Sequence, residues 1–243
     1  MSGARSTGAR SAGASTAGAG AAGTAVVTGA SSGIGRAVAV RLLADGWRVV
    51  GLSRRDPGLE GLDWRPCDLS DPAAPAAVTA DLASVRALVH AAGFQESGTL
   101  ADLDPESGRR MYDVHVGAAT TLAHALVDRL DDGGRIVLVG SRTAAGVAGK
   151  SLYAASKAAL RGLARSWAQE LAPRRVTVNV VEPGPTRTAM LQDPRRSATP
   201  VAVPPLGRLV EPEEVAALVA HLLGPDGAMV TGQHWQVCGG ASL

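Results

Sequence analysis

Short apolar runs and longer segments of helical periodicity alternate along the chain from Thr24 onward. The short runs predict strands, because they are too brief for helices and are rich in valine, leucine and isoleucine. We expect strands at Thr24–Thr28, Arg48–Ser53, Leu62–Cys67, Val85–His90, Arg135–Gly140, Val176–Val181 and His234–Val237. Strands of this kind that alternate with helices are typical of a parallel sheet covered by helices on both faces.

The helical segments lie between these strands. Helices are expected over Ile34–Ala44, from Asp71-Pro72 onward, over Arg109–Leu130, over Ser151–Leu171 and from Glu211-Pro-Glu-Glu onward. In the second of them Asp71 is expected to be the N-cap, with Pro72 at the first helical position. No repeat or domain break interrupts the alternation. The pattern predicts one α/β domain with a doubly wound parallel sheet over residues 24–243.

The first 23 residues are almost entirely Ala, Gly, Ser and Thr, with two arginines and no acid. Such a segment cannot bury enough apolar surface to offset its ordering entropy, so we expect a disordered leader over residues 1–23. It lacks the apolar core of a signal peptide. Its Arg and Ser content also fits a transit peptide.

Composition excludes several classes of protein. A net charge of +2, from 24 basic and 22 acidic residues, argues against a nucleic-acid partner. No apolar run approaches the roughly 18 residues that a membrane helix needs. Cys67 and Cys238 have neither metal-ligand spacing nor the pattern of a disulfide framework, so we expect no metal and a cytoplasmic location. With 46% hydrophobic but only 3% aromatic residues, the core is expected to be aliphatic.

Tyr153 and Lys157 are the first candidate for chemistry. They are four residues apart, so on a helix they share one face, and a nearby ammonium lowers the pKa of a phenol. Of the 24 basic residues only Lys150 and Lys157 are lysines. Because lysine and arginine are not interchangeable, this position is expected to need a compact charge. The alternative is a surface lysine that packs beside a tyrosine.

A glycine-rich turn follows the first strand and opens the first helix. Glycines let the backbone approach a pyrophosphate, and the helix N-terminus offers free N–H groups. The candidate cofactor contacts in this turn are Gly29, Ser31, Ser32, Gly33, Ile34 and Gly35.

The end of the second strand indicates which nicotinamide cofactor is bound. NAD sites place an acid there to hold the ribose 2′-hydroxyl, whereas this chain has Ser53 and Arg54, followed by Arg55. Arginine forks match phosphate geometry, so NADP(H) is favoured over NAD(H). The alternative is that both arginines are ordinary solvated charges.

Together these motifs resemble the short-chain dehydrogenase/reductase family, and its 3-oxoacyl-thioester reductases in particular, from about Thr24 to Leu243. The family's TGxxxGxG motif matches Thr28–Gly35, and its YxxxK motif matches Tyr153–Lys157. Its catalytic serine matches Ser141. The resemblance implies a Rossmann-type fold and further cofactor contacts at Asp68, Leu69, Ala92, Gly93, Pro183, Gly184, Thr186 and Thr188, besides Tyr153 and Lys157.

The family also implies a division of labour among the catalytic residues. Tyr153 would give a proton to a substrate carbonyl as hydride arrives, or accept one in reverse. Lys157 would lower the pKa of Tyr153 and bond the nicotinamide ribose. Ser141 would steady the carbonyl oxygen. On this basis the function expected is NADPH-dependent reduction of a ketone, 3-oxoacyl-thioester-like or small.

Two positions depart from the family pattern. Where the family has Asn-Asn-Ala-Gly, this chain has His90-Ala-Ala-Gly93, so the amides that brace the strand are expected to be lost. Where the family has a fourth catalytic residue, an Asn, this chain has His115. His115 is expected either to relay a proton between Lys157 and solvent or to be a core histidine.

The substrate is less clearly indicated. Five basic residues, Arg142, Lys150, Arg187, Arg195 and Arg196, are expected to form a positive rim that suits an anionic carrier or substrate. The alternative is scattered solvation charge. Two other functions remain open, a dehydrogenase of cyclic, sugar or steroid-like alcohols and a non-catalytic dinucleotide-binding sensor. The family commonly forms tetramers through the helices that match Arg109–Leu130 and Ser151–Leu171, so a homo-oligomer is expected.

Overall fold

The computed structural model describes residues 22–196 and 201–243, which form one seven-stranded parallel sheet in the order β3-β2-β1-β4-β5-β6-β7. The strands are β1 Thr24–Thr28, β2 Arg48–Ser53, β3 Asp63–Pro66, β4 Val85–His90, β5 Leu130–Val139, β6 Thr177–Pro183 and β7 His234–Val237. Four of the predicted strands, β1, β2, β4 and β7, have the predicted bounds. The predicted leader falls almost wholly outside the described residues.

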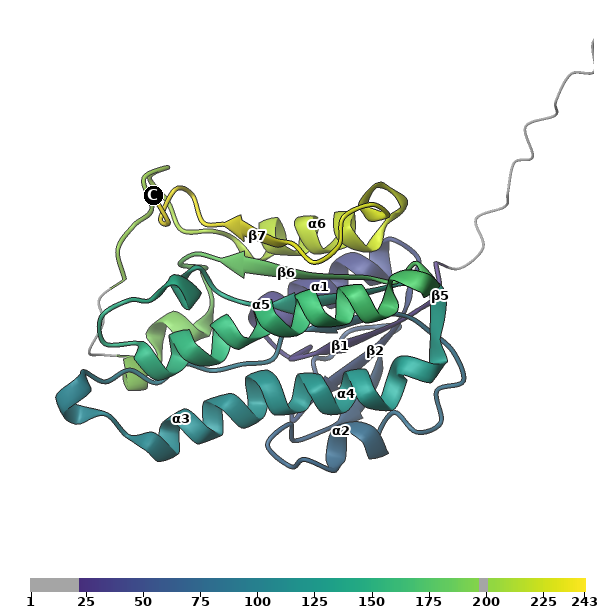
Figure 1. Cartoon of the computed structure of the whole chain (residues 1–243), viewed down its shortest axis with the longest axis horizontal. Helices are drawn as coiled ribbons and strands as arrows, with labels where there is room; N and C mark the ends of the chain where they lie inside the picture. Colours follow the sequence, from purple (N-terminus) through teal and green to yellow (C-terminus); the bar gives the residue numbers. More distant parts are fainter. Residues whose placement is uncertain (1–21, 197–200) are drawn as a thin grey trace, which may run out of the picture.

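Helices cover both faces of the sheet, as the alternating pattern predicts. They are α1 Gly33–Ala44, α2 Ala74–Ala77, α3 Pro105–Tyr112, α4 Ala118–Leu126, α5 Ser151–Leu171 and α6 Pro212–Leu223. Figure 1 shows α3, α4 and α5 on one side of the sheet and α1 and α6 on the other. No helix in the described part of the chain is long and apolar enough to cross a membrane.

Two aliphatic layers hold the helices against the sheet. On one face, Leu122 of α4 and Leu160 of α5 pack against strand residues such as Leu88. On the other face, Val38 of α1 and Val219 of α6 pack against the strand side chains that point to that side of the sheet. Tyr153 is the only buried aromatic residue in the described ranges, so the core is aliphatic, as composition predicts.

Two helix predictions are wrong in detail. Asp71 does not cap a helix: its Oδ1 accepts the Ala73 N–H at 2.9 Å in a turn, and α2 begins only at Ala74. The predicted helix Arg109–Leu130 starts earlier, at Pro105, where Asp104 accepts two backbone N–H groups as N-cap. It is also interrupted by a π-helical turn, Asp113–Gly117, which carries His115. Such turns are frequent at functional sites.

The strand order reverses between β1 and β4, the inner pair of the sheet. In open α/β sheets, ligands bind outside the carboxyl ends of the strands at such a reversal. The loops after β1, β4, β5 and β6 all emerge at this edge, so the fold brings the predicted motifs together there.

Candidate active site

A cavity of about 190 Å³ opens at this edge of the sheet. Its walls come from the turn after β1, the loops after β4, β5 and β6, and the start of α5. Fourteen of the predicted site residues line it: Gly29, Ser32, Gly33, Ile34, Gly35, Ala92, Gly93, Ser141, Tyr153, Lys157, Pro183, Gly184, Thr186 and Thr188.

The predicted catalytic residues converge at one end of the cavity. Ser141 lies two residues after the end of β5, and Tyr153 and Lys157 lie on the first turns of α5, with all three side chains buried. The Ser141 hydroxyl acts on the Tyr153 phenol and lowers its pKa. Lys157 Nζ lies 6.0 Å from the centre of the Tyr153 ring and donates to the Val139 carbonyl at 2.8 Å. The Tyr153 phenol, the Ser141 hydroxyl and the Lys157 amine therefore lie together at this end of the cavity.

The predicted effect of Lys157 on the pKa of Tyr153 is not found. Burial raises the pKa of Tyr153, and the groups that act in the opposite direction are Ser141 and Arg196. Burial also lowers the pKa of Lys157 to about 7, so its amine is only about half protonated at neutral pH. The physical reason is desolvation, which disfavours the charged form of both side chains.

The other end of the cavity is a backbone cradle that fits a dinucleotide. Gly29 has φ 70°, and a Cβ there would come 3.0 Å from the Ala92 Cα. A Cβ on Gly35 would collide with the Gly29 carbonyl. The N-terminus of α1 begins at Gly33, which also has a positive φ. A glycine turn that closes onto a helix N-terminus suits a pyrophosphate.

Four predicted cofactor contacts lie beside the cavity, at the ends of β2 and β3. Ser53 is buried and donates to the Arg55 carbonyl at 2.8 Å, while Arg54 is exposed. The charge of Arg54 helps to lower the pKa of Asp68, after the stronger effect of hydrogen bonds from Ser70. Leu69 packs into the core. Gly29 N–H donates to the Leu52 carbonyl at 2.9 Å, so this edge adjoins the glycine turn. Ser31 also falls outside the lining.

The amide side chains are absent, as the sequence shows, and His90 braces the strand in their place. Thr28 Oγ1 accepts the Ala91 and Ala92 N–H groups, both at 3.0 Å, so its own proton goes to His90 Nδ1 at 3.1 Å. His90 Nε2–H then donates to the Val114 carbonyl at 3.1 Å. Burial, followed by Lys157, lowers the pKa of His90 to about 3. A neutral imidazole therefore ties β1, β4 and the π-helical turn together.

His115 is fully buried, and both of its ring nitrogens have partners. Nε2 accepts the Phe94 N–H at 3.2 Å, so Nδ1 carries the proton and donates to Ser156 Oγ at 2.9 Å. Ser156 in turn donates to the Tyr153 carbonyl at 2.8 Å. Burial and the charge of Lys157 hold the pKa of His115 well below its usual value. Of the two expectations, this geometry favours the core histidine, because no ring nitrogen is left to carry a relayed proton.

The five predicted basic rim residues separate into two groups. Arg187 pairs with Glu211 at 2.9 Å, and Arg195 pairs with Asp193 at 2.6 Å and Glu96 at 3.1 Å. Neither lines the cavity. Arg142, Lys150 and Arg196 do line it.

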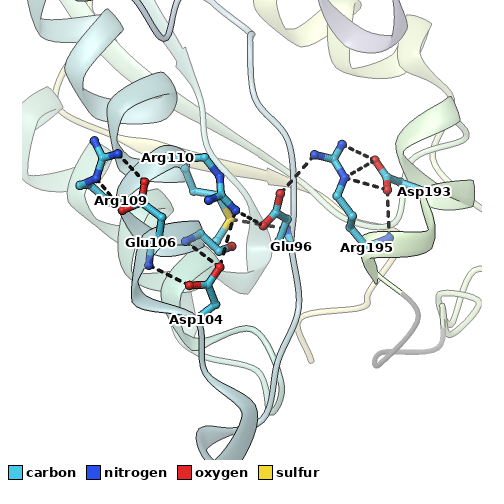
Figure 2. Close-up of polar contacts among 9 residues, drawn as sticks. Glu96, Asp104, Glu106, Arg109, Arg110, Asp193 and Arg195 are labelled. Carbon is cyan, nitrogen blue, oxygen red and sulfur yellow. Dashed lines mark hydrogen bonds and ion pairs between the residues drawn. The ribbon is translucent and has the colours of Figure 1, made fainter.

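Glu96 also pairs with Arg110 of α3 at 3.0 Å, so one carboxylate joins two arginines from separate segments. Figure 2 shows Glu96 between the side chains of Arg110 and Arg195. We call these three residues the ionic latch. It fixes the loop after β6 to the loop after β4, and the Ser97 N–H reinforces it by donating to the Arg195 carbonyl at 3.0 Å.

Sequence reasoning missed three features of the site. Thr143 lies 2.8 Å from Ser141 Oγ and orients it, and its spacing of two residues from the serine was the available signal. Gln95 is buried and lines the cavity, with no signal in its sequence context. Cys238 packs against Gly184: a Cβ at position 184 would come 2.7 Å from the Cys238 Cα, so glycine is needed at 184. Among the described residues, no cluster of ligating side chains could hold a metal.

Residues 29–242 match a family model described as Enoyl-(Acyl carrier protein) reductase. The chain is 35% identical over 234 residues to the 3-oxoacyl-[acyl-carrier-protein] reductase FabG of Vibrio cholerae, covering 89% of this chain and 96% of the relative. It is 32% identical over 220 residues to a cyclic-di-GMP-binding biofilm dispersal mediator protein of Escherichia coli, covering 86% and 92%. A solved structure of a blue fluorescent protein from a metagenomic library in complex with NADPH superposes with a TM-score of 0.82, at 36% identity over 90% of this chain and 98% of that one.

Proposed function

The chain belongs to the short-chain dehydrogenase/reductase family of oxidoreductases, and from this membership we propose that it reduces a ketone to a secondary alcohol with NADPH. The observation that carries the proposal is the convergence of Ser141, Tyr153 and Lys157 at one end of a cavity whose other end is a glycine cradle. The FabG relative is named as a 3-oxoacyl reductase, which supports a carbonyl substrate.

NADPH is the proposed cofactor, and when bound it supplies the hydride. The glycine turn Gly29–Gly35 would hold its pyrophosphate, and Arg54, exposed just after β2 beside this turn, would bind a 2′-phosphate. The NADPH complex of the structural neighbour supports this choice. Ala92, Gly93, Pro183, Gly184, Thr186 and Thr188 would line the nicotinamide half.

The proton chemistry follows from the buried trio. Tyr153 Oη donates its proton to the carbonyl oxygen as that oxygen gains negative charge. Ser141, oriented by Thr143, donates a hydrogen bond to the same oxygen and so stabilises the developing alkoxide. When protonated, Lys157 would stabilise the tyrosinate that this proton transfer leaves behind. In the reverse direction the same groups accept the proton, so oxidation of an alcohol is the alternative direction of the same site.

A binding role without catalysis is the competing proposal, because one relative is named as a cyclic-di-GMP-binding protein. A binder has no use for a buried phenol that lies with a serine and a lysine of lowered pKa at one end of a cavity. The retained trio therefore favours the reductase.

The test is NADPH oxidation over a panel of ketones by the wild type and Tyr153→Phe. We expect kcat/KM to fall by roughly 10²- to 10⁴-fold in the variant, because the proton donor is lost while the cradle remains. Activity that survives in Tyr153→Phe would overturn the mechanism. Repeating the panel with NADH and with Arg54→Ala tests the cofactor: the variant should raise the KM for NADPH and leave that for NADH unchanged.

A homotetramer in the cytoplasm is also proposed. Ala155 and Gly162 lie on the exposed face of α5, and a Cβ at Gly162 would meet nothing within 4 Å, which leaves room for a helix of another copy. Both cysteines are free, as in a reducing compartment. Light scattering of the purified protein tests the tetramer, with a monomer counting against it, and cell fractionation tests the location.

A further inference from the structure

Both lysines of the chain, and two of its arginines, line the same cavity. Lys157 belongs to the catalytic trio described above. The other three cations are Arg142, Lys150 and Arg196, which we call the cationic wall. None of the residues that line the cavity is acidic within the described ranges. A buried or half-buried group of like charges is costly unless something negative balances it.

The cationic wall lies at the catalytic end of the cavity. Arg142 follows Ser141 directly, and Lys150 immediately precedes α5, which carries Tyr153. Arg196, in the loop after β6, also faces this end, since its charge lowers the pKa of Tyr153. The glycine cradle for a pyrophosphate is at the other end, so the cofactor phosphates do not account for these charges.

The three side chains act on one another, and no acid of the described residues is among the groups that shift the pKa of Lys150. Lys150 is 8% exposed, and its pKa is lowered by burial, then by Arg196 and Arg142. A neighbouring carboxylate would act in the opposite direction. Asp193, which bonds Arg195 in the same loop, is the acid that acts on Arg196.

Arg196 is directed inward by its surroundings. Its neighbour Arg195 turns outward into the ionic latch with Glu96 (Figure 2). Arg196 Nη1 donates to the Met190 carbonyl at 3.1 Å, and its side chain is 8% exposed. Two adjacent arginines thus have opposite placements, one at the surface and one against the substrate end of the cavity.

Building on the proposed function, we propose that the preferred substrate is an oxo acid whose free carboxylate lies close to the ketone and is bound by the cationic wall. A guanidinium and an ammonium suit a carboxylate, which accepts charge-assisted hydrogen bonds from both. An oxoacyl thioester has only a neutral carbonyl at this distance from the ketone. The wall therefore separates this chain from relatives named for carrier-bound substrates.

The experiment compares three substrates that share one ketone: acetoacetate, its methyl ester and its N-acetylcysteamine thioester. Initial rates of NADPH oxidation give kcat/KM for each with the wild type, Arg196→Met, Lys150→Met and Arg187→Met. Arg187→Met is the matched control, because it removes one charge from the same loop at a residue paired with Glu211 outside the cavity.

The wild type is expected to prefer acetoacetate to both neutral substrates by roughly 10-fold or more, since a hydrogen bond to a charged group is worth about 1.5–3 kcal/mol. Arg196→Met and Lys150→Met should each erase most of this preference by lowering kcat/KM for acetoacetate much more than for the ester and the thioester. Arg187→Met should retain it. Arg196→Lys, which keeps the charge, should recover part of it.

Two outcomes overturn the inference while the reductase stands. One is a wild type that reduces the ester or thioester as well as the acid. The other is an Arg196→Met that lowers all three rates equally, which would assign Arg196 to Tyr153 rather than to the substrate. If no ketone is reduced at all, the proposed function fails, and the binding of acetoacetate with NADPH, measured by calorimetry on Tyr153→Phe, then tests the wall separately. If acetoacetate and its methyl ester bind this variant equally well, the inference that the cationic wall binds a carboxylate is overturned.

Discussion

At the scale of single residues, burial decides the protonation of the site. Tyr153, Lys157, His90 and His115 all have pKa values displaced toward the neutral form, because each is removed from water. The sequence predicted a charged pair. The structure instead shows a largely neutral polar cluster whose protons are fixed by hydrogen bonds.

His115→Asn should leave the shape of the kcat–pH profile unchanged and lower kcat by less than about tenfold. The imidazole is neutral across the working range and acts by holding Ser156, which bonds the Tyr153 carbonyl. The measurement is kcat from pH 5.5 to 9 beside His124→Asn, the same change at an exposed histidine. A pKa in the profile that shifts in His115→Asn but not in His124→Asn would support the proton-relay role of His115 instead.

Lys157→Met should stabilise the protein more at low pH than at high pH. The folded pKa of Lys157 is about 7 and its ordinary value is 10.5, so the unfolded chain binds the extra proton between these values. Between pH 7 and 10.5 the free energy of unfolding of the wild type therefore rises with pH, by up to about 1.4 kcal/mol per pH unit. Lys157→Met lacks this titration, so its gain in stability over the wild type becomes smaller as the pH increases. Urea unfolding at pH 6.5 and 9.5 measures it, with Arg165→Met as control. A difference independent of pH would contradict the assignment.

At the scale of elements, α5 serves both the site and the fold. Its first turns present Tyr153 and Lys157, and one turn after Lys157 Arg161 reaches Glu182 near the end of β6. Arg161 holds both carboxylate oxygens, at 2.5 and 2.8 Å, and the Glu182 side chain is fully buried. This ion pair fixes the helix to the strand whose following loop carries Pro183–Thr188.

Arg161→Ala should destabilise the protein by about 3 kcal/mol or more, because it leaves a buried carboxylate without its cation. Gln236 and His234, each 3.4 Å from Glu182, replace little of the lost interaction. Thermal or urea unfolding measures the loss, and adding Glu182→Gln to the variant should recover part of it. If Arg165→Ala, at an exposed position of the same helix, costs as much, the loss is not due to the ion pair.

At the scale of the whole molecule, the site is assembled from loops that are distant in sequence. The ionic latch joins residues 96, 110 and 195, and the loop it holds carries Arg196 into the cavity. The arrangement depends on the reversal of strand order, which brings the loops after β4 and β6 to one edge.

Glu96→Gln should raise the KM for the ketone by up to about fivefold, with kcat and the KM for NADPH nearly unchanged. Ion pairs near the surface contribute about 0–1 kcal/mol each, and Glu96 makes two that only position the loop. Steady-state kinetics with each reactant varied measures the effect. Glu106→Gln is the control, because the ion pair of Glu106 is with Arg109 of its own helix. An equal rise in the KM for NADPH would contradict the proposal that Glu96 acts only through the loop that carries Arg195 and Arg196.

The sequence by itself determined the alternation of elements, the bounds of four strands, the helix Ser151–Leu171 and the glycine turn. These depend on local periodicity and on backbone freedom, which short segments encode. Tyr153 and Lys157 were found for the same reason, since their relation is one helical turn.

Only the tertiary structure decided which charges face the site and which protons move. Arg195 and Arg196 are indistinguishable in sequence, yet one lies in the latch and the other lines the cavity. The π-helical turn that seats His115 and the bracing of β4 by His90 also depend on partners many residues away. The physical reason is that burial, Coulomb interactions and hydrogen-bond partners are set by distance in space, which residue types and spacing do not record.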